Sequence, residues 1–180
     1  MEHSRSDNSL MKAFAPVDAK GLSNLILDWS SKLGVSITPM KLQKLLYYCH
    51  ADFLIQTGIP LIQQDFEAWE YGPVIPCIFQ EFKQHGSNFI ETRAYRFNPI
   101  SCERELATVN DLGNIEDIVR KTFDAYVRYT ASTLSNMTHS ETGPWAETLR
   151  RFSSGSLKGR CIENDVIAKH HRLPLRESLH

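Results

Sequence analysis

The sequence predicts a mainly α-helical domain of the α+β type, built around a central buried helix, with a small antiparallel β element. Three observations lead to this prediction. Several segments repeat apolar residues at i, i+3, i+4 and i+7, which is the spacing of one helix face. One of them, which starts at Pro39, is apolar on nearly every side, as is typical of a helix at the centre of a domain. Extended patterns are confined to residues 66–71 and to parts of residues 87–112.

Local signals delimit the first two helices. Asp18 is placed to cap the first helix and Gly34 to end it. The apolar stripe of the first helix is Leu22, Leu25, Ile26, Trp29 and Leu33. The second helix begins at Thr38 and Pro39, a capping residue followed by proline at the first helical position, and Gly58 stops it. Its main apolar face is Leu42, Leu45, Leu46, Cys49 and Phe53.

Residues 66–71 predict a short strand, and a third helix is expected to follow it. Gly72 and Pro73 are expected to make the turn into this helix. Pro73 and Pro76 suit its first turn, where proline removes no intrahelical hydrogen bond. Gly86 follows its end. Trp69 lies between the central helix and this turn, so we expect its ring to be largely buried.

The C-terminal half contains shorter elements. One or two short strands are indicated in residues 87–112 by four apolar residues: Phe89, Ile90, Tyr95 and Phe97. Asn114 is the expected cap of a fourth helix, and Thr130 of a short fifth one. A further helix is predicted to open at Pro144, and a last helical segment is expected near residues 162–171.

The chain length predicts a single main domain, because 180 residues are enough to bury a substantial core. We expect residues 1–17 to form a flexible N-terminal arm and residues 18–152 to form the domain. Residues 153–180 are expected to form a loop followed by a C-terminal helical segment or tail. The basic residues concentrated after residue 150 are compatible with an acidic partner or with a solvated surface.

Composition narrows the class of protein. The formal net charge is −1, so no global field attracts nucleic acid or an anionic membrane. No apolar run approaches the ~20 residues of a spanning helix, and the N-terminus lacks the apolar region of a signal peptide. We therefore expect a cytoplasmic protein without membrane contact. The four cysteines lie far apart and are expected to be free thiols.

Catalytic motifs are sparse, and no cofactor or metal is expected. The side chains of neighbouring residues on a helix point in different directions. We therefore interpret Cys49 as a buried thiol and not as a nucleophile paired with His50. For the same reason, we expect His170 and His171 to be solvated and not to form a metal site. His139 could act as a general base oriented by Glu141, or as a structural histidine that hydrogen-bonds the backbone near a helix end. No second acid, nucleophile or metal set accompanies this pair.

Three large aromatic side chains could belong either to the core or to a protein-binding surface. Trp69, Tyr71 and Trp145 are residue types that fill cores and also anchor protein interfaces. Core packing is the simpler interpretation for each of them, and a residue at the rim of the core can serve both purposes.

Three blocks of sequence carry a family signature. The first block is residues 38–48, which read TPMKLQKLLYY, and the second is residues 66–76, which include FEAW and YGPV followed by Pro76. The third block comprises three pairs: Leu134-Ser135, Thr138-His139 and Pro144-Trp145. In this order they resemble the SocA/GepA-like proteins, also called the Panacea antitoxin domain. The resemblance covers about residues 18–152, and an extra residue before Pro144 slightly stretches the third block.

The resemblance implies a mostly helical domain that acts as the antitoxin of a toxin–antitoxin pair in bacteria, plasmids or prophages. Its implied partner is a cognate toxin, neutralised by direct binding. In one branch of the family the antitoxin acts instead as an adaptor that delivers the toxin to an AAA+ protease. No catalytic residues are established for the family pattern. An enzyme that uses His139 and Glu141, or a phage protein that acts on a host target, are the remaining alternatives.

Candidate residues follow from the blocks together with the aromatic residues. The candidate toxin-binding residues are Trp69, Tyr71, His139 and Trp145. A structural role is expected for the motif residues Pro39, Leu42, Leu45, Gly72, Pro73 and Pro144, which start helices, fill the core or shape the turn.

Overall fold

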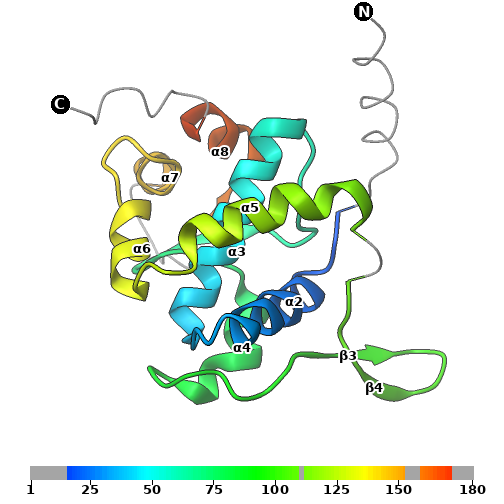
Figure 1. Ribbon diagram of the computed structural model, residues 1–180. Helices are drawn as coiled ribbons and strands as arrows, with labels where there is room; N and C mark the ends of the chain where they lie inside the picture. The colour runs from blue at the N-terminus through cyan, green and yellow to red at the C-terminus, as the bar shows by residue number, and fades with distance from the viewer. Residues whose placement is uncertain (1–15, 110–111, 153–158, 172–180) are drawn as a thin grey trace, which may run out of the picture.

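The computed structural model describes residues 16–109, 112–152 and 159–171. Helix α3 (Pro39–Thr57) passes through the middle of the molecule and is contacted directly by five other helices (Figure 1). These are α2 (Ala19–Lys32), α4 (Pro76–Phe82), α5 (Glu116–Tyr126), α6 (Ala131–Thr138) and α8 (Asn164–His171). Helix α7 (Pro144–Arg151) packs against α8 and the small sheet. The predicted helical class and central helix are confirmed.

The ends of α3 form as the local signals indicate. The Lys41 amide donates to Thr38 Oγ1 at 3.3 Å, and Pro39 occupies the first turn. Gly58 ends the helix in the left-handed conformation with φ 74°. Leu42 and Leu45 are fully buried, as is the rest of the predicted face. The central position of α3 follows from this burial, since a helix that is apolar all round must be covered on all sides.

A three-stranded antiparallel sheet lies beside α3, in the order β2-β1-β5. Its strands are β1 (Phe66–Trp69), β2 (Gly72–Val74) and β5 (Cys161–Ile162). The strand predicted within residues 66–71 is confirmed. The prediction that Gly72 and Pro73 turn into a helix is wrong, because both residues lie in β2 and α4 begins only at Pro76. Proline is compatible with β2 because this strand is at the edge of the sheet.

Strands β3 (Tyr95–Asn98) and β4 (Glu103–Leu106) form a separate hairpin that projects from the helical body (Figure 1). Phe89 and Ile90, which had indicated a strand, lie outside β3 and β4. The fourth predicted helix, α5, is preceded by a 3-10 turn, η2 (Gly113–Ile115), so Ile115 and not Asn114 is its N-cap. A second 3-10 turn, η1 (Lys83–His85), follows α4.

The first and last described segments pack against the helical body. Val17 forms a parallel bridge with Ile62 on the N-terminal side. On the C-terminal side, Ile162 belongs to β5 and not to the last helix, which starts at Asn164. The expected arm up to residue 15, the loop at residues 153–158 and the tail from residue 172 lie outside the described residues. No helix in the described ranges is long and apolar enough to cross a membrane.

A buried histidine, His50, and a half-buried one, His171, join α8 to α3. His50 is almost fully buried; its Nδ1 accepts from the Ile62 amide at 3.3 Å, and its Nε2 lies 2.8 Å from Asn164 Oδ1. This arrangement requires the neutral ring with its proton on Nε2. His171 Nε2 lies 3.0 Å from the Tyr47 hydroxyl. Burial lowers the pKa of His50 and lowers the pKa of His171 to about 4, with the nearby His170 adding to the second effect.

These histidines predict that the protein is less stable in mild acid. Their folded-state pKa values lie below the ordinary value of 6.5, so the unfolded chain binds more protons as the pH falls below 6.5. The stability that comes from keeping these two histidines neutral is therefore fully present above pH 6.5 and decreases as the pH falls toward 4. We expect the free energy of unfolding, measured with urea, to fall by roughly 2 kcal/mol between about pH 7 and 5. In the double variant His50→Gln/His171→Gln, the free energy of unfolding should change less with pH. A wild-type free energy of unfolding that does not change with pH would contradict the role given to these two histidines.

Candidate protein-binding site

The two faces of β1 have different environments. Phe66 and Ala68 are buried, whereas Glu67 and Trp69 are half-buried on the opposite face, in keeping with the two-residue period of a strand. The expected burial of Trp69 is therefore met only in part, because the residue is half-buried on the face of β1 turned away from the core. The Trp69 ring packs edge-on against Phe79 with ring centroids 4.9 Å apart, and its Nε1 donates to Glu67 Oε2 at 2.7 Å. Its outward position makes Trp69 available at a surface cavity.

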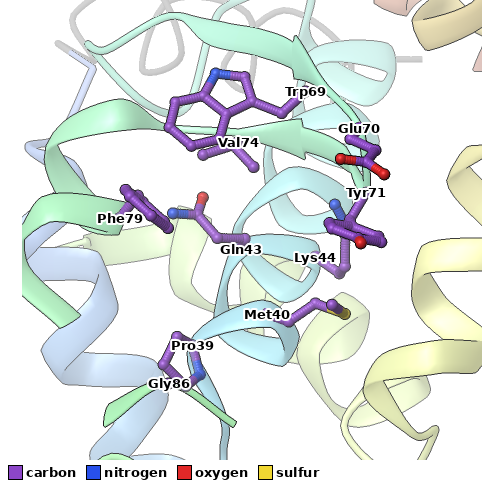
Figure 2. A pocket seen from close by; sticks show the side chains of 10 residues that line it. All are labelled: Pro39, Met40, Gln43, Lys44, Trp69, Glu70, Tyr71, Val74, Phe79 and Gly86. Atoms are coloured by element: carbon purple, nitrogen blue, oxygen red, sulfur yellow. The ribbon is translucent and has the colours of Figure 1, made fainter. Parts of the chain in front are cut away.

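This cavity, the hairpin pocket, has a volume of about 600 Å³ and lies between α3, the β1–β2 hairpin and α4. Figure 2 shows Trp69, Val74 and Phe79 at one end, and Tyr71, Lys44 and Met40 at the other. The complete lining is Pro39, Met40, Gln43, Lys44, Trp69, Glu70, Tyr71, Val74, Phe79 and Gly86. Most of this lining is apolar or aromatic, and a few polar groups converge on it, which is the usual character of a binding pocket.

Side chains from α6 and α7 bind the turn between β1 and β2 by its backbone. Trp145 Nε1 donates to the Trp69 carbonyl at 2.7 Å. His139 Nε2 lies 3.0 Å from the Glu70 carbonyl, and Ser135 Oγ donates to the Tyr71 carbonyl at 2.9 Å. Three successive carbonyls of one turn are thus bound from two helices. These contacts fix the turn that presents the Trp69 and Tyr71 side chains at the hairpin pocket.

His139 occupies a structural position at the C-cap of α6. Its Nδ1 lies 2.6 Å from the Ser135 carbonyl, and its ring packs against Trp145 with centroids 4.3 Å apart. Both ring nitrogens therefore face backbone carbonyl oxygens. Among the described contacts, no hydrogen bond joins His139 to the Glu141 carboxylate. The arrangement turns both ring nitrogens toward the protein backbone, as expected for a structural histidine.

The central helix α3 holds the other side of the hairpin. Gln43 makes two hydrogen bonds to the Ile75 backbone, accepting from its amide at 2.8 Å and donating to its carbonyl at 3.1 Å. Lys44 Nζ donates to the Pro73 carbonyl at 3.0 Å. Lys44 is only 1% exposed, and its burial lowers its pKa to about 7. Both ends of the hairpin are thereby fixed by side chains from distant segments.

Gly72 is required by close packing at this point. It has φ 98°, a conformation that residues with a side chain rarely adopt. A Cβ at this position would lie 2.4 Å from Thr138 Oγ1 and 2.7 Å from Lys44 Nζ. The absence of a side chain at position 72 therefore lets β2 approach both α3 and α6.

The structure brings the four candidate toxin-binding residues together around one turn. Tyr71 is 59% exposed at the pocket, Trp69 lines it, and His139 and Trp145 support the turn behind them. The structural motif residues separate: Leu42 and Leu45 lie in the core, Gly72 and Pro73 in β2, Pro39 at the pocket and Pro144 at the start of α7.

Three of the polar residues that fix the hairpin were not singled out from the sequence: Gln43, Lys44 and Ser135. A signal was present for two of them. Gln43 and Lys44 are polar residues in a helix that is otherwise apolar almost all round, and both are buried. Buried polar side chains are retained only with partners, so their position in the sequence indicated a specific contact.

The remaining candidate residues do not assemble into a catalytic or metal site. Cys49 is buried with its Sγ near the Val119 carbonyl, whereas His50 contacts Ile62 and Asn164. His170 pairs with Glu147, and His171 contacts Tyr47, so the two adjacent rings diverge. Within the described ranges, no group of three or more His, Cys, Asp or Glu side chains is arranged to hold a metal ion.

Comparisons with known proteins identify the family. The family described as "Antitoxin SocA-like, Panacea domain" matches residues 42–146, more than half of the chain. The chain is also 34% identical over 129 residues to the protein named Antitoxin SocA of Caulobacter vibrioides (strain NA1000 / CB15N), an alignment that covers 72% of this chain and 69% of that protein. No solved structure matches the chain. The chain therefore belongs to the SocA-like Panacea antitoxin family.

Proposed function

We propose that this protein neutralises a cognate toxin by binding it directly, through the hairpin pocket and the exposed aromatic residues at its rim. The observation that carries this proposal is that all three blocks of the family signature meet at one place. The first block supplies Gln43 and Lys44, the second the β1–β2 hairpin, and the third the side chains that bind its turn. A surface fixed by so many contacts is preorganised, which lowers the entropic cost of binding a partner.

The character of the site favours binding over catalysis. Its rim carries Trp69 and Tyr71, which are residue types enriched at the energetic centres of protein interfaces, and Phe79, a type enriched at interfaces in general. The candidate base His139 has both ring nitrogens facing backbone carbonyls. A cavity with aromatic walls and a rigid backbone suits insertion of side chains from a partner protein.

The proposal is tested with the toxin encoded by the adjacent, co-transcribed reading frame. Co-expression should rescue cells from this toxin, and the two proteins should co-purify as a stable complex. Rescue without a complex would contradict direct neutralisation. Rescue that is lost in protease-deficient cells would instead identify the adaptor mechanism, in which the chain delivers the toxin to an AAA+ protease.

Tyr71→Ala should weaken the complex without unfolding the protein. The ring is 59% exposed and accounts for much of the rim, so its loss removes contact area but little packing. Truncation of an interface hot spot costs about 2 kcal/mol or more, which corresponds to roughly 30-fold in Kd. Isothermal titration calorimetry with the toxin measures this change.

Tyr129→Ala is the matched control for this prediction. Tyr129 is also an exposed tyrosine, with 47% of its surface accessible, and it follows α5, outside the hairpin pocket. Its truncation should leave both Kd and melting temperature nearly unchanged. Equal losses of affinity in the two variants would place the toxin surface elsewhere.

A further inference from the structure

Lys44 has a buried amine without a charged partner in the described part of the protein. Its ammonium donates to the Pro73 carbonyl at 3.0 Å, and no ion pair joins it to a carboxylate there. Glu70 lines the same pocket but forms no salt bridge with Lys44. An ammonium group removed from water is costly unless a negative charge compensates it. The structure therefore contains an amine at the wall of an apolar pocket that a ligand carboxylate can hold in its charged form.

A purely structural role does not account for a lysine at this position. The Pro73 carbonyl needs a donor, and a neutral amide can supply one at lower desolvation cost. Gln43, one residue earlier on α3, performs this task for the Ile75 backbone. Burial lowers the Lys44 pKa to about 7, so near neutral pH a carboxylate in the pocket would favour the charged ammonium.

The lining of the pocket defines the rest of the ligand. Trp69, Val74 and Phe79 form an apolar end, and Lys44 lies at the other end with Tyr71 and Met40 (Figure 2). A volume of about 600 Å³ accommodates several side chains. The complementary ligand is therefore a short stretch of polypeptide that has apolar side chains and one carboxylate.

From this arrangement we infer that the hairpin pocket receives an apolar segment of the toxin whose carboxylate, from an Asp, a Glu or the chain end, forms an ion pair with Lys44. The inference rests on the proposed function, because the toxin is the partner that supplies the segment. It goes further by assigning Lys44 as the residue that selects the chemistry of that segment.

Lys44→Met tests the inference because methionine keeps the length and apolar stem of the side chain and removes the charge. The variant should fold, since it removes a buried amine, and its melting temperature checks this. Its Kd for the toxin should rise by roughly 30- to 1,000-fold, the usual effect of deleting one partner of a buried ion pair. Lys121→Met, an exposed lysine on α5 outside the pocket, is the matched control and should bind like the wild type. Lys44→Gln, which keeps a donor for Pro73, serves as a second variant if Lys44→Met does not fold.

A double-mutant cycle then identifies the carboxylate. Each Asp and Glu of the toxin is changed to Asn or Gln, and the last residue of the toxin is deleted in a further variant. One of these changes should weaken binding to the wild type strongly and have little effect on binding to the Lys44 variant. Wild-type affinity in a folded Lys44 variant, or the absence of any coupled carboxylate, would overturn the inference and leave the proposed function intact. If the wild type itself does not bind the toxin, the proposed function fails.

Discussion

Truncating Phe66 to alanine should destabilise the protein by about 3–5 kcal/mol, a large share of the ~5–15 kcal/mol that holds a domain folded. Phe66 is 1% exposed, and its ring packs edge-on against Tyr47 and near His50. Removal of the ring leaves a cavity between β1 and the central helix. Urea denaturation followed by circular dichroism should show a much lower midpoint, and the variant should be poorly soluble.

Trp69→Ala, on the same strand, is the informative comparison. The Trp69 side chain contacts Phe79 and Glu67 on the outer face of β1, and the turn contact from Trp145 is made to its backbone carbonyl. Its truncation should therefore cost only about 1–2 kcal/mol in stability, within the range of ordinary substitutions. Toxin binding should nevertheless fall by roughly 30-fold or more, because an interface tryptophan is lost. If Trp69→Ala unfolded the protein as fully as Phe66→Ala, Trp69 would be a core residue and not a contact residue.

Gly72→Ala should have the second large effect, a loss of about 2–4 kcal/mol. Part of this cost is the strained backbone at φ 98°, and part is the collision of the new Cβ with Thr138 Oγ1 and Lys44 Nζ. For a chain of this size, 1 kcal/mol corresponds to about 2–4 °C, so we expect a drop of roughly 5–15 °C in Tm. Because the displaced groups lie at the hairpin pocket, toxin affinity should fall as well.

Gly34→Ala separates these two causes. Gly34 also has a positive φ of 67°, but a Cβ there would have no atom within 4 Å. Gly34→Ala should therefore destabilise the protein by only about 1–2 kcal/mol, from backbone strain alone, and should leave toxin affinity unchanged. Equal Tm shifts for the two variants would mean that Lys44 and Thr138 move aside at little cost, and that close packing at Gly72 does not matter.

Much of the helical framework could be predicted from the sequence. Thr38, Pro39 and Gly58 bound α3 as expected, and Thr130 caps α6 by accepting from the Thr133 amide. Such signals are reliable because a cap, a fixed φ or a left-handed residue acts on atoms only a few positions away. The apolar surface of α3 also determined its central position, since burial of that surface is possible only under other elements.

The same local reasoning failed where one sequence pattern is compatible with two structures. A Gly-Pro pair is compatible with a helix start and with an edge strand, and pairing of Pro73 with Ala68 decided for the strand. Trp69 was expected inside because it lies between the central helix and the Gly72-Pro73 turn, but it shares a strand face with Glu67 while Phe66 and Ala68 occupy the buried face. The period of a strand fixes which residues share a face, and only packing against α3 decides which face is inside.

By itself, then, the sequence determined the helical class, the central helix and the family blocks, because these depend on nearby residues and on composition. Only the tertiary structure decided which residues form the candidate binding site. Trp145, His139 and Ser135 reach the turn across 76, 69 and 64 positions of sequence, and Lys44 reaches Pro73 in β2 across 29. No local pattern encodes these contacts. They arise because the packing of α6 and α7 beside the hairpin brings their polar side chains to backbone carbonyls that must find donors away from water.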